Sequence, residues 1–496
     1  MSEIQLGFSD AFALSTLVAV VAGVLLGYLI GVIPGISRPT ALAVAIPVTF
    51  YLSPISAIAF LVAISKASGA GGAITAILIN TPGEPSSAAT CLDGYPLTRQ
   101  GKGEKALKIA LYASVLGDVF ATIVLIVIAE PMARIALKIG PIELVAVLMF
   151  ALTSIAALSG PSLTKGLISG ILGLFAATVG LDIETATPRL TFGFIELYDG
   201  LPVIAVVIGM LGMSEMLVQF GRHFRSADED AAAAADAGST PENRRVTWAE
   251  LRQTTPIMLL GSAIGTIAGI LPGLGATVAS FLSYAAARRV SANREQFGHG
   301  ALEGVAAAES ADNATVPASL IPLFALGIPA SVGAALLIGA FTIHGITPGP
   351  RLFVENGRLV YGVFASMMLT SAVMLVLGRI GLVGLARLAA VPQTIIVPSV
   401  IFLCIAGAYI ESNSMFGVYV MFGFALLAYV FRAYGFSVVT FLIGYLVGPM
   451  FELALRQSII ISRGDIGRLL DHPVALVMLA ATVVAVWQLG RIQLSR

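Results

Sequence analysis

The sequence predicts an all-α polytopic membrane protein of about twelve transmembrane helices. These helices should form two repeats, which we expect to be inverted, with broken helices or re-entrant segments at Pro-Gly motifs. Apolar residues make up 57% of the 496 residues and charged residues only 11%, whereas soluble domains have about 25% charged residues. Apolar stretches recur along the chain, and a glycine pattern ending in Pro-Gly occurs twice. This composition excludes a soluble enzyme.

The apolar stretches of about 20 residues have the length that crosses a bilayer. They lie near 11–33, 109–129, 141–159, 163–181, 200–220, 255–272, 318–343, 359–378, 394–410, 414–431, 436–453 and 473–490. Less regular apolar segments lie around 41–64, 71–80 and 274–287. No Lys or Arg precedes the first stretch, which is also too long for the apolar core of a signal peptide. We therefore expect it to be a retained span.

Two basic clusters, at residues 99–108 and 222–252, indicate the orientation. About four predicted spans separate them, so both lie on one side, which we assign to the cytoplasm because Lys and Arg are enriched in cytoplasmic loops. An N-terminus outside and a C-terminus inside fit best, with the acidic loop 182–199 outside. Three arginines then lie outside, against this rule: Arg456, Arg463 and Arg468.

One polar segment, residues 226–245, has no apolar periodicity and is typical of a flexible connector. It predicts a first membrane half at 1–225, a cytoplasmic linker at 226–250 and a second membrane half at 251–496. We place repeat 1 at about 11–100 and repeat 2 at about 255–350.

Two segments of the sequence show the repeat directly. Residues 23–35 read GVLLGYLIGVIPG and residues 261–273 read GSAIGTIAGILPG, with four glycines and one proline at a constant offset. A glycine every fourth residue allows a second helix to pack closely. The Pro-Gly pair that follows should break the helix, and broken backbone at membrane depth is tolerated only where protein or a water-filled cavity surrounds it.

A second break follows in each half. Residues 77–90, ILINTPGEPSSAAT, and residues 323–335, LFALGIPASVGAA, each carry a proline and small polar residues after an apolar approach. Paired discontinuous helices are typical of the midplane site of secondary transporters. A half-helix that begins inside the membrane presents free N–H groups and a positive dipole end to an anion, while unwound carbonyls can hold a cation.

Ionisable residues in these stretches are candidate functional residues, because they are costly in a membrane. Lys66 could supply positive charge to an anion, reach an interface, or pair with Asp93 or Glu84. Arg38, just after the first Pro-Gly pair, could likewise bind an anion or reach an interface.

Further polar residues lie at or near the breaks. Asn80 and Thr81, and to a lesser extent Ser86 and Ser87, could hydrogen-bond a carboxylate or their own helix. Glu309, Asp312 and Asn313 could cap a helix at the interface or coordinate an ion or substrate.

Other functions are poorly supported. Lys plus Arg equals Asp plus Glu at 28 each, so no basic excess suggests nucleic acid. Cys91 and Cys404 show no metal-binding spacing. We find no H-E-x-x-H, G-x-S-x-G or ATP-binding loop. We expect no catalytic residue and no cofactor, so that an ion gradient or a partner supplies the energy.

The motifs together resemble the large membrane subunit of the tripartite tricarboxylate transporter family, the TctA type. The segments that carry the resemblance are GVIPGISRPTALAVAIPVTF, ILINTPGEPSSAATCLDGYPLTRQGKGEKAL, GILPGLGATVASFLSYAAARR, FGHGALEGVAAAESADNATV and LFALGIPASVGAALLIGAFTIHGITPGP. The resemblance covers nearly the whole chain. One departure is Lys66, in a region that the family usually fills with Gly and Tyr.

The resemblance implies a permease of the bacterial inner membrane that imports di- or tricarboxylates or related acids by secondary transport with Na⁺ or H⁺. It also implies two partners, a small membrane subunit of about four helices and a periplasmic solute-binding protein. The alternatives are a stand-alone organic-anion carrier and a channel, with intramembrane hydrolysis a distant third.

These considerations give the expected site. We expect the substrate to lie against Pro34, Gly35, Ser37, Arg38, Lys66, Asn80, Thr81, Pro82, Gly83, Pro272, Gly273, Gly275, Thr277, Asn313, Gly327, Pro329 and Ser331. We expect Glu309, Asp312 and Asn313 to hold the coupling ion. Helices carrying this site should move against a scaffold of roughly 106–220 and 359–490, giving alternating access.

Overall fold

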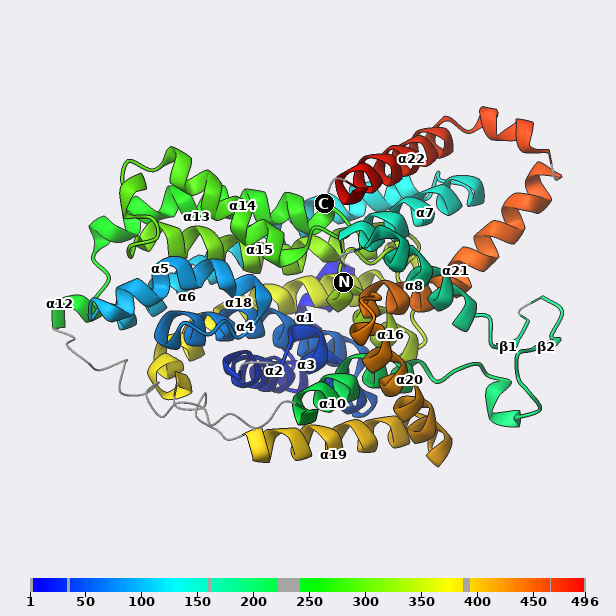
Figure 1. Cartoon of the computed structure of the whole chain (residues 1–496), viewed down its shortest axis with the longest axis horizontal. Helices are drawn as coiled ribbons and strands as arrows, with labels where there is room; N and C mark the ends of the chain where they lie inside the picture. Colours follow the sequence, from blue (N-terminus) through cyan, green and yellow to red (C-terminus); the bar gives the residue numbers. More distant parts are fainter. Residues whose placement is uncertain are drawn as a thin grey trace.

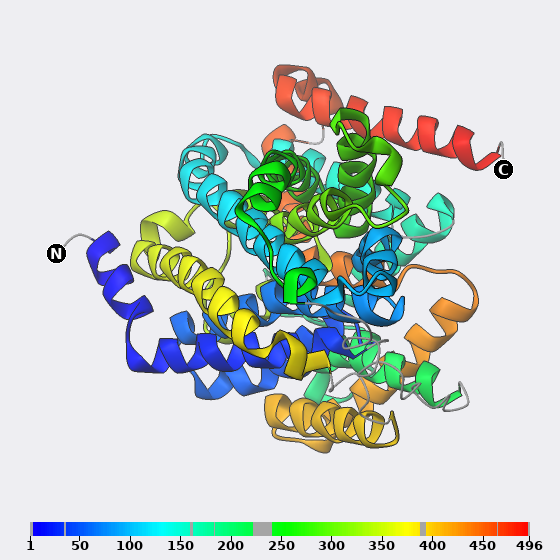
Figure 2. The same cartoon turned by 90° about the vertical axis from the view of Figure 1, so that its left-hand side faces the viewer.

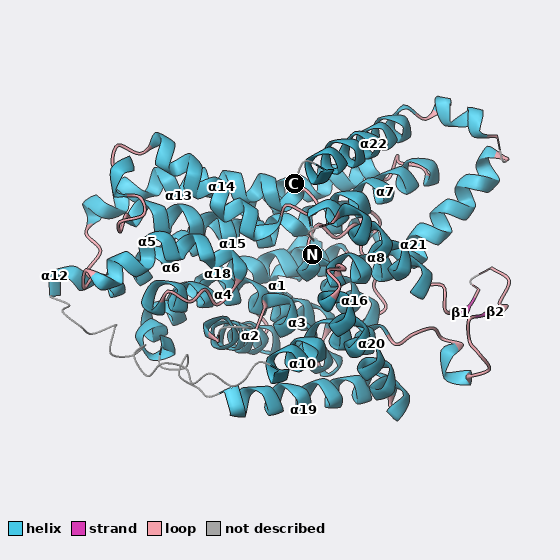
Figure 3. Ribbon diagram, in the orientation of Figure 1, coloured by secondary structure: helices cyan, strands magenta, loops and turns pink. Residues whose placement is uncertain are grey.

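The computed structural model of the chain describes residues 3–33, 36–158, 162–182, 184–221, 241–386, 393–463 and 465–494. Helices dominate these residues, and one short pair of antiparallel strands lies at the right-hand edge of Figure 1 (Figures 1 and 3). A view at right angles shows long helices crossing at many angles (Figure 2). The all-α fold class is therefore confirmed.

The elements before residue 222 include short 3₁₀ turns and, as η4, a π-helical turn. In chain order they are α1 Glu3–Ala11, α2 Leu14–Val32, α3 Arg38–Ala45, η1 Ile46–Tyr51, α4 Pro54–Ile79, η2 Pro85–Ser87, α5 Ala88–Arg99, α6 Gly103–Ala136, α7 Pro141–Leu158, α8 Leu163–Ala176, β1 Gly180–Leu181, β2 Pro188–Arg189, η3 Ile195–Leu197, α9 Val203–Val207, η4 Ile208–Met213 and α10 Ser214–Gly221.

The elements after residue 240 are α-helices and short 3₁₀ turns. They are α12 Pro241–Arg244, α13 Trp248–Ile270, α14 Gly275–Val290, η5 Arg294–Gln296, α15 Leu302–Leu326, α16 Val332–Ile343, α17 Leu352–Glu355, α18 Gly357–Ala386, α19 Gln393–Ser412, α20 Met415–Ala433, α21 Val438–Ser462, η7 Ile466–Asp471 and α22 Pro473–Leu494. Most of the predicted linker, residues 226–240, lies outside the described residues.

Eight helices in the described ranges are long and apolar enough to cross a membrane, and five shorter apolar helices accompany them. On α2 the exposed side chains are mostly apolar, among them Leu14, Val18 and Leu25, as expected for a surface in contact with lipid rather than water. The chain is therefore a multi-pass membrane protein. The count of about twelve spans stays a prediction.

The glycine stripes bring helices into close contact, as the sequence indicates. A β-carbon added at Gly27 would lie 2.7 Å from the carbonyl oxygen of Ile64 on α4. One added at Gly265 would lie 2.3 Å from the carbonyl oxygen of Ala311 on α15. Helix α2 thus packs on α4, and α13 packs on α15.

All four predicted helix breaks are present within the described ranges. Helix α2 ends at Val32 before α3, α4 at Ile79 before η2 and α5, α13 at Ile270 before α14, and α15 at Leu326 before α16. The same order, helix, break, helix, helix, break, helix, therefore occurs in both halves. Pro34 and Gly35, within the first break, lie outside the described residues.

Three expected boundaries are wrong. The stretch near 318–343 is not one span, because α15 ends at Leu326 and α16 begins at Val332. The less regular segments around 41–64 and 71–80 have other bounds, since one helix, α4, runs unbroken from Pro54 to Ile79. Residues 309–313 do not cap a helix, because α15 begins at Leu302, two turns earlier.

Contacts between the basic clusters support the predicted orientation. The Lys105 ammonium lies 2.7 Å from Glu250 Oε1, and Lys108 Nζ donates to the carbonyl oxygen of Arg244 at 2.7 Å. The two clusters therefore lie at the same end of the molecule.

The unexpected position of Arg456 also has a physical reason. Its guanidinium pairs with Asp182 at the base of the β1–β2 hairpin, and Arg189 of the same hairpin lies 2.5 Å from Glu452. The hydrogen bond that Arg456 donates to Asp182 holds the pKa of the Asp182 carboxyl well below its usual range. The acidic loop thus neutralises an arginine that the predicted orientation places outside, against the charge rule.

Candidate functional site

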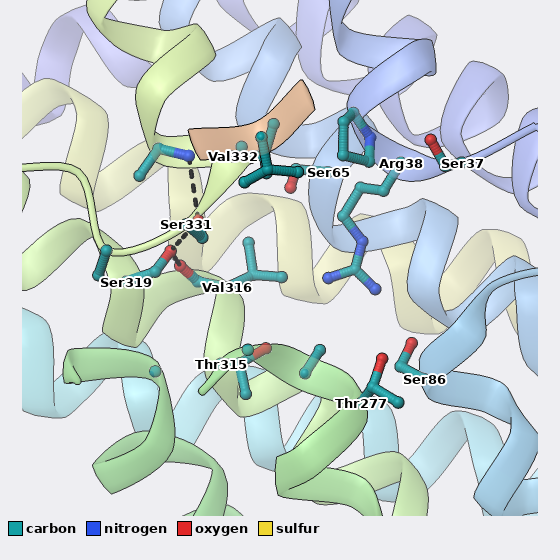
Figure 4. A pocket seen from close by; sticks show the side chains of 18 of the residues that line it. Ser37, Arg38, Ser65, Ser86, Thr277, Thr315, Val316, Ser319, Ser331 and Val332 are labelled. Carbon is teal, nitrogen blue, oxygen red and sulfur yellow. Dashed lines mark hydrogen bonds between the residues drawn. The ribbon is translucent and has the colours of Figure 1, made fainter. Parts of the chain in front are cut away.

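A cavity of about 410 Å³ lies where the broken helices of the two halves meet. Its wall is formed by α3, α4 and η2 from the first half, by α13 to α16 from the second, by Ile155 of α7 and by Val439 and Ile443 of α21. Figure 4 shows its polar lining, with Ser37 and Arg38 facing Ser331 and Thr277. This volume is in the range of small-molecule sites, which are about 300–1,000 Å³.

Two helix N-termini of the first half open onto this cavity. Ser37 is the N-cap of α3, and its Oγ accepts from the Thr40 N–H at 3.4 Å. The second N-terminus is the start of η2, which continues into α5, and it places Glu84, Pro85 and Ser86 in the wall. Both starts follow a Pro-Gly break. In their first turns the Thr40 N–H is capped by Ser37, the Ser87 N–H donates to the Glu84 carbonyl oxygen, and Pro39 and Pro85 have no N–H, which leaves the N–H groups of Arg38 and Ser86 nearest the cavity.

Two N-termini of the second half complete the set. Helix α14 begins at Gly275, whose φ of +65° favours glycine and beside which a β-carbon would meet no atom within 4 Å. Its first residues, to Thr277, line the cavity. Helix α16 is capped by Ser331, whose Oγ accepts from the Ala334 N–H at 3.1 Å and donates to Ser319 Oγ at 3.1 Å (Figure 4).

Four helix starts face one cavity. The N-terminus of a helix carries up to about half a positive charge, and here these starts and Arg38 share the wall with the Glu84 carboxylate. Their free N–H groups are suited to carboxylate oxygens. The arrangement is that of an anion site built from backbone.

Arg38 is the charged centre of the site. Its Nη2 lies 2.9 Å from Glu84 Oε2 and 3.2 Å from Asp312 Oδ1, and its Nε donates to Glu84 Oε1 at 3.4 Å. Within the described part of the chain Nη1 makes no hydrogen bond or ion pair, and Figure 4 shows the guanidinium extending into the cavity. The two carboxylates fix Arg38 in place while one amino group remains available to a ligand.

Gly69 makes room for this ion-pair cluster. A β-carbon at Gly69 would lie 2.5 Å from Arg38 Nη2 and 3.0 Å from Asp312 Oδ2. Ser68 beside it donates to Glu84 Oε1 at 2.6 Å. The glycine-rich part of α4 is therefore needed for the approach of α3 and α15, although it does not break the helix.

Several buried polar atoms around Arg38 have no partner in the described ranges. They are Ser86 Oγ, Ser87 Oγ and Asn313 Oδ1. Buried polar groups are normally hydrogen-bonded, and exceptions are informative. Ser86 also lines the cavity, so its hydroxyl is free to donate to a bound ligand.

The structure brings some of the predicted site residues together. Those that line the cavity are Ser37, Arg38, Gly273, Gly275, Thr277 and Ser331. Gly327 and Pro329 are buried in the second break, where Gly327 ends α15 with a φ of +75°. The Gly273 N–H donates to the carbonyl oxygen of Ala330 at 3.4 Å, which ties the two breaks of the second half together.

Other predicted residues lie outside the lining. Gly83 packs against Gly31 and Gly72, while Pro82 and Pro272 are partly exposed. Asn313 is buried and its Nδ2 donates to the Glu309 carbonyl oxygen at 3.1 Å.

Asn80 and Thr81, which the sequence predicts to contact the substrate, lie outside this cavity. Both side chains are exposed and do not line the cavity. Helix α4 continues to Ile79, and Asn80 ends it in the left-handed conformation at φ 55°. The break therefore contributes Ser86, five residues further on.

Lys66 is also not in the cavity. It is buried in α4 and pairs with Asp118 of α6 at 2.8 Å, not with Asp93 or Glu84. The sequence analysis missed Asp118, although a carboxylate inside the apolar stretch 109–129 could have revealed it.

Further lining residues were missed. They are Ser65, Thr315 and Ser319. Thr315 and Ser319 lie four residues apart, and with Asp312 they form one face of α15, which is a signal that the sequence does contain. Glu84 was considered only as a partner of Lys66, and the structure pairs it with Arg38.

The acidic residues of α15 contact hydroxyls and Arg38. Glu309 Oε1 accepts from Thr90 at 2.5 Å and Oε2 from Ser114 at 3.0 Å. Among the described residues no group of three His, Cys, Asp or Glu side chains could hold a metal ion.

Comparisons with known proteins are consistent with this geometry. Residues 17–443 match the family described as the tripartite tricarboxylate transporter TctA family. An uncharacterized 52.8 kDa protein in the TAR-I ttuC' 3'region of Agrobacterium vitis is 36% identical over 487 residues, covering 98% of this chain and 95% of that protein. An uncharacterized protein in the TAR-II ttuC' 3'region of the same organism is 39% identical over 223 residues, 45% of this chain and 92% of that protein.

Proposed function

Because the chain belongs to the tripartite tricarboxylate transporter TctA family, a family of transporter components and not of enzymes, we propose that it is the permease of a binding-protein-dependent importer of carboxylates. The substrate is a di- or tricarboxylate or a related organic acid, and a Na⁺ or H⁺ gradient drives its uptake. The permease works in the bacterial inner membrane with a small membrane subunit and a periplasmic solute-binding protein.

The observation that carries this proposal is the convergence of four helix N-termini and Arg38 on one cavity. Carboxylates bind to the free N–H groups of these starts, and Ser86 and Thr277 donate further hydrogen bonds. Apolar residues such as Val316 and Leu337 cover the rest of the wall and suit the carbon chain of an organic acid.

We further propose that the two segments with the same element order form an inverted repeat. The Gly-stripe helices α2 and α13 then cross the membrane in opposite directions, and the site lies between the repeats near the midplane. Rocking of these repeats against the remaining helices gives alternating access. Single cysteines at 100–102, between α5 and α6, and at 346–351, between α16 and α17, in a variant lacking Cys91 and Cys404, should be labelled from opposite sides. Labelling from the same side contradicts the inversion.

Uptake into proteoliposomes tests the function. The vesicles contain the chain with its small subunit, and labelled citrate, succinate and malate are offered with and without the binding protein, under a Na⁺ gradient and then a pH gradient. Saturable uptake that needs the binding protein and one gradient is expected. Uptake without the binding protein indicates a stand-alone carrier, and flux independent of both gradients indicates a channel.

Two variants test the site. Ser86→Ala and Thr277→Ala each remove one hydrogen bond to a charged ligand, worth about 1.5–3 kcal/mol, so KM should rise about tenfold or more. Thr81→Ala is the matched control, because Thr81 is exposed outside the cavity, and its KM should stay unchanged. A raised KM in Thr81→Ala alone would refute this placement of the site.

A further inference from the structure

A second buried polar cluster joins α4 to α6 and α18 behind the cavity wall. Ser65 lines the cavity, whereas its neighbour Lys66 reaches α6, where its Nζ lies 2.8 Å from Asp118 Oδ2. The same ammonium donates to the Met367 carbonyl oxygen at 2.6 Å and to Ser371 Oγ at 3.2 Å on α18. Lys66 and Asp118 are at most 1% exposed. The pair therefore connects a cavity helix to two other helices.

In this cluster the Lys66 ammonium has a partner for each of its hydrogens, whereas among the described residues the Asp118 carboxylate has a partner for only one of its two oxygens. Three acceptors match the three hydrogens of the Lys66 ammonium, and Asp118 Oδ2 also accepts from Ser371 Oγ at 2.5 Å. Asp118 Oδ1 has no partner in the described part of the chain, and neither has the buried hydroxyl of Thr122 one turn further along α6. A buried carboxylate oxygen without a partner is costly. Of the two carboxylate oxygens, Oδ1 is thus the one that lacks a hydrogen-bond partner within the described ranges and would take up a proton.

We propose that Asp118 is the proton-binding site that couples carboxylate transport to H⁺; this rests on the secondary transport proposed above. The Asp118 carboxylate takes one proton from water onto Oδ1 and becomes a neutral carboxylic acid, with no change of electrons. Lys66 keeps its proton and loses its counter-charge. The attraction that holds α4 to α6 is then removed.

The coupling ion at this position is a proton and not Na⁺. The Lys66 ammonium already occupies, at 2.8 Å from Oδ2, the place where a metal cation would lie. A metal cation bound through oxygen needs several ligands, whereas the free oxygens here are Asp118 Oδ1 and the Thr122 hydroxyl. A proton needs only one of them.

Two further carboxylates, Glu309 and Asp312 of α15, connect α6 with the cavity, and no hydrogen bond among the described residues joins them to Asp118. Ser114, one turn before Asp118 on α6, donates to Glu309 Oε2 of α15 at 3.0 Å. Glu309 lies one turn from Asp312 on α15, and Asp312 contacts Arg38 in the cavity. Chains of carboxylates of this kind are typical of proton pathways in transporters.

The other packed helices add few charges near the pair. From α2, the Tyr28 hydroxyl faces the cluster and donates to the Met374 carbonyl oxygen at 2.8 Å. From α5, Cys91 lies near Glu309. On α13 the acidic side chain that faces α6 is Glu250, at the first turns of both helices, where it pairs with Lys105. Lys66 is therefore the cation that neutralises Asp118.

Coupling reaches the substrate through α4. The same helix carries Ser65 in the cavity wall, Ser68 bonded to Glu84, and Gly69 against Arg38. Movement of α4 after protonation changes the contacts of Arg38 with its two carboxylates. Proton uptake and substrate binding thereby act on one rigid element.

The test measures two activities separately: exchange of the substrate acid across the membrane, and its accumulation driven by a pH gradient. Proteoliposomes take up labelled citrate, succinate or malate either by counterflow against the same unlabelled acid at equal pH, or by accumulation under a pH gradient without Na⁺. One pH unit supports about a tenfold accumulation for each proton carried. The variants are Asp118→Asn and, to avoid an unpaired Lys66, the double variant Lys66→Met with Asp118→Leu, which replaces both charges by apolar groups.

The wild type should show both activities, and both variants should keep counterflow within a few-fold and lose accumulation. Accumulation at the wild-type level in either variant overturns the proposal, as does a wild type driven only by Na⁺. The proposal is also overturned if the double variant loses counterflow as well as accumulation while its thermal midpoint is unchanged. The Lys66–Asp118 pair would then be needed for substrate exchange itself and not only for coupling to H⁺. If the wild type shows no counterflow with any acid, the proposed function fails instead.

Discussion

Arg38 offers the sharpest test of the site, because it holds two buried carboxylates. Its side chain is 10% exposed, and those of Glu84 and Asp312 are 6% and 1% exposed. Arg38→Met removes the shared cation and leaves both acids buried next to each other. Removing one partner of a buried ion pair costs about 3–5 kcal/mol. With two acids losing one cation, we expect the upper part of this range.

The assay is thermal unfolding of the purified protein in detergent, followed by uptake in proteoliposomes. Arg38→Met should lower the midpoint clearly and abolish uptake. The triple variant Arg38→Met, Glu84→Gln and Asp312→Asn removes the unpaired charges, so it should recover most of the midpoint but no uptake.

The control is Arg134→Met. Arg134 is 77% exposed and pairs with Glu130 four residues away on α6, an arrangement worth about 0.3–0.5 kcal/mol. Its midpoint should stay near the wild-type value. An Arg38→Met protein as stable as the Arg134→Met control would refute the view that Arg38 neutralises the two acids.

Two further predictions concern packing and the hairpin. Gly265→Ala places a methyl group 2.3 Å from the Ala311 carbonyl oxygen, so it should lower the thermal midpoint. Gly423→Ala, with no atom within 4 Å, should leave the midpoint unchanged or raise it, because alanine is favoured over glycine within a helix by up to about 1 kcal/mol; equal midpoints in the two variants would contradict the close packing. Asp182→Asn should make the hairpin more sensitive to protease. Because the folded pKa of Asp182 is depressed, its stabilisation is complete above the unfolded pKa of about 3.9 and is lost only as the pH falls further. The difference between Asp182→Asn and wild type should therefore be the same at pH 8 and pH 5, and a difference that disappears at pH 5 would show that the carboxylate is not held ionised.

The sequence by itself determined the class of the protein and the positions of its helix breaks. Long apolar runs with few charges indicate membrane spans, although the run near 318–343 is divided between α15 and α16. The Pro-Gly pairs at 34–35, 82–83 and 272–273 each lie between two helices, whereas Pro317 and Pro322, without a following glycine, lie inside α15. The glycine stripes likewise predicted close packing, which Gly27 and Gly265 show. These are local properties, so they can be inferred without knowing what lies nearby in space.

Only the tertiary structure decided which polar residues meet. Arg38 and Asp312 are 274 residues apart and Lys66 and Ser371 are 305 apart, and no local pattern specifies such contacts. Helix α4 ends at Ile79 and leaves Asn80 exposed, whereas Ser86, further along the same break, lies in the cavity wall. Charge in a membrane must be paired at short range, and the partner is chosen by how helices pack rather than by spacing along the chain.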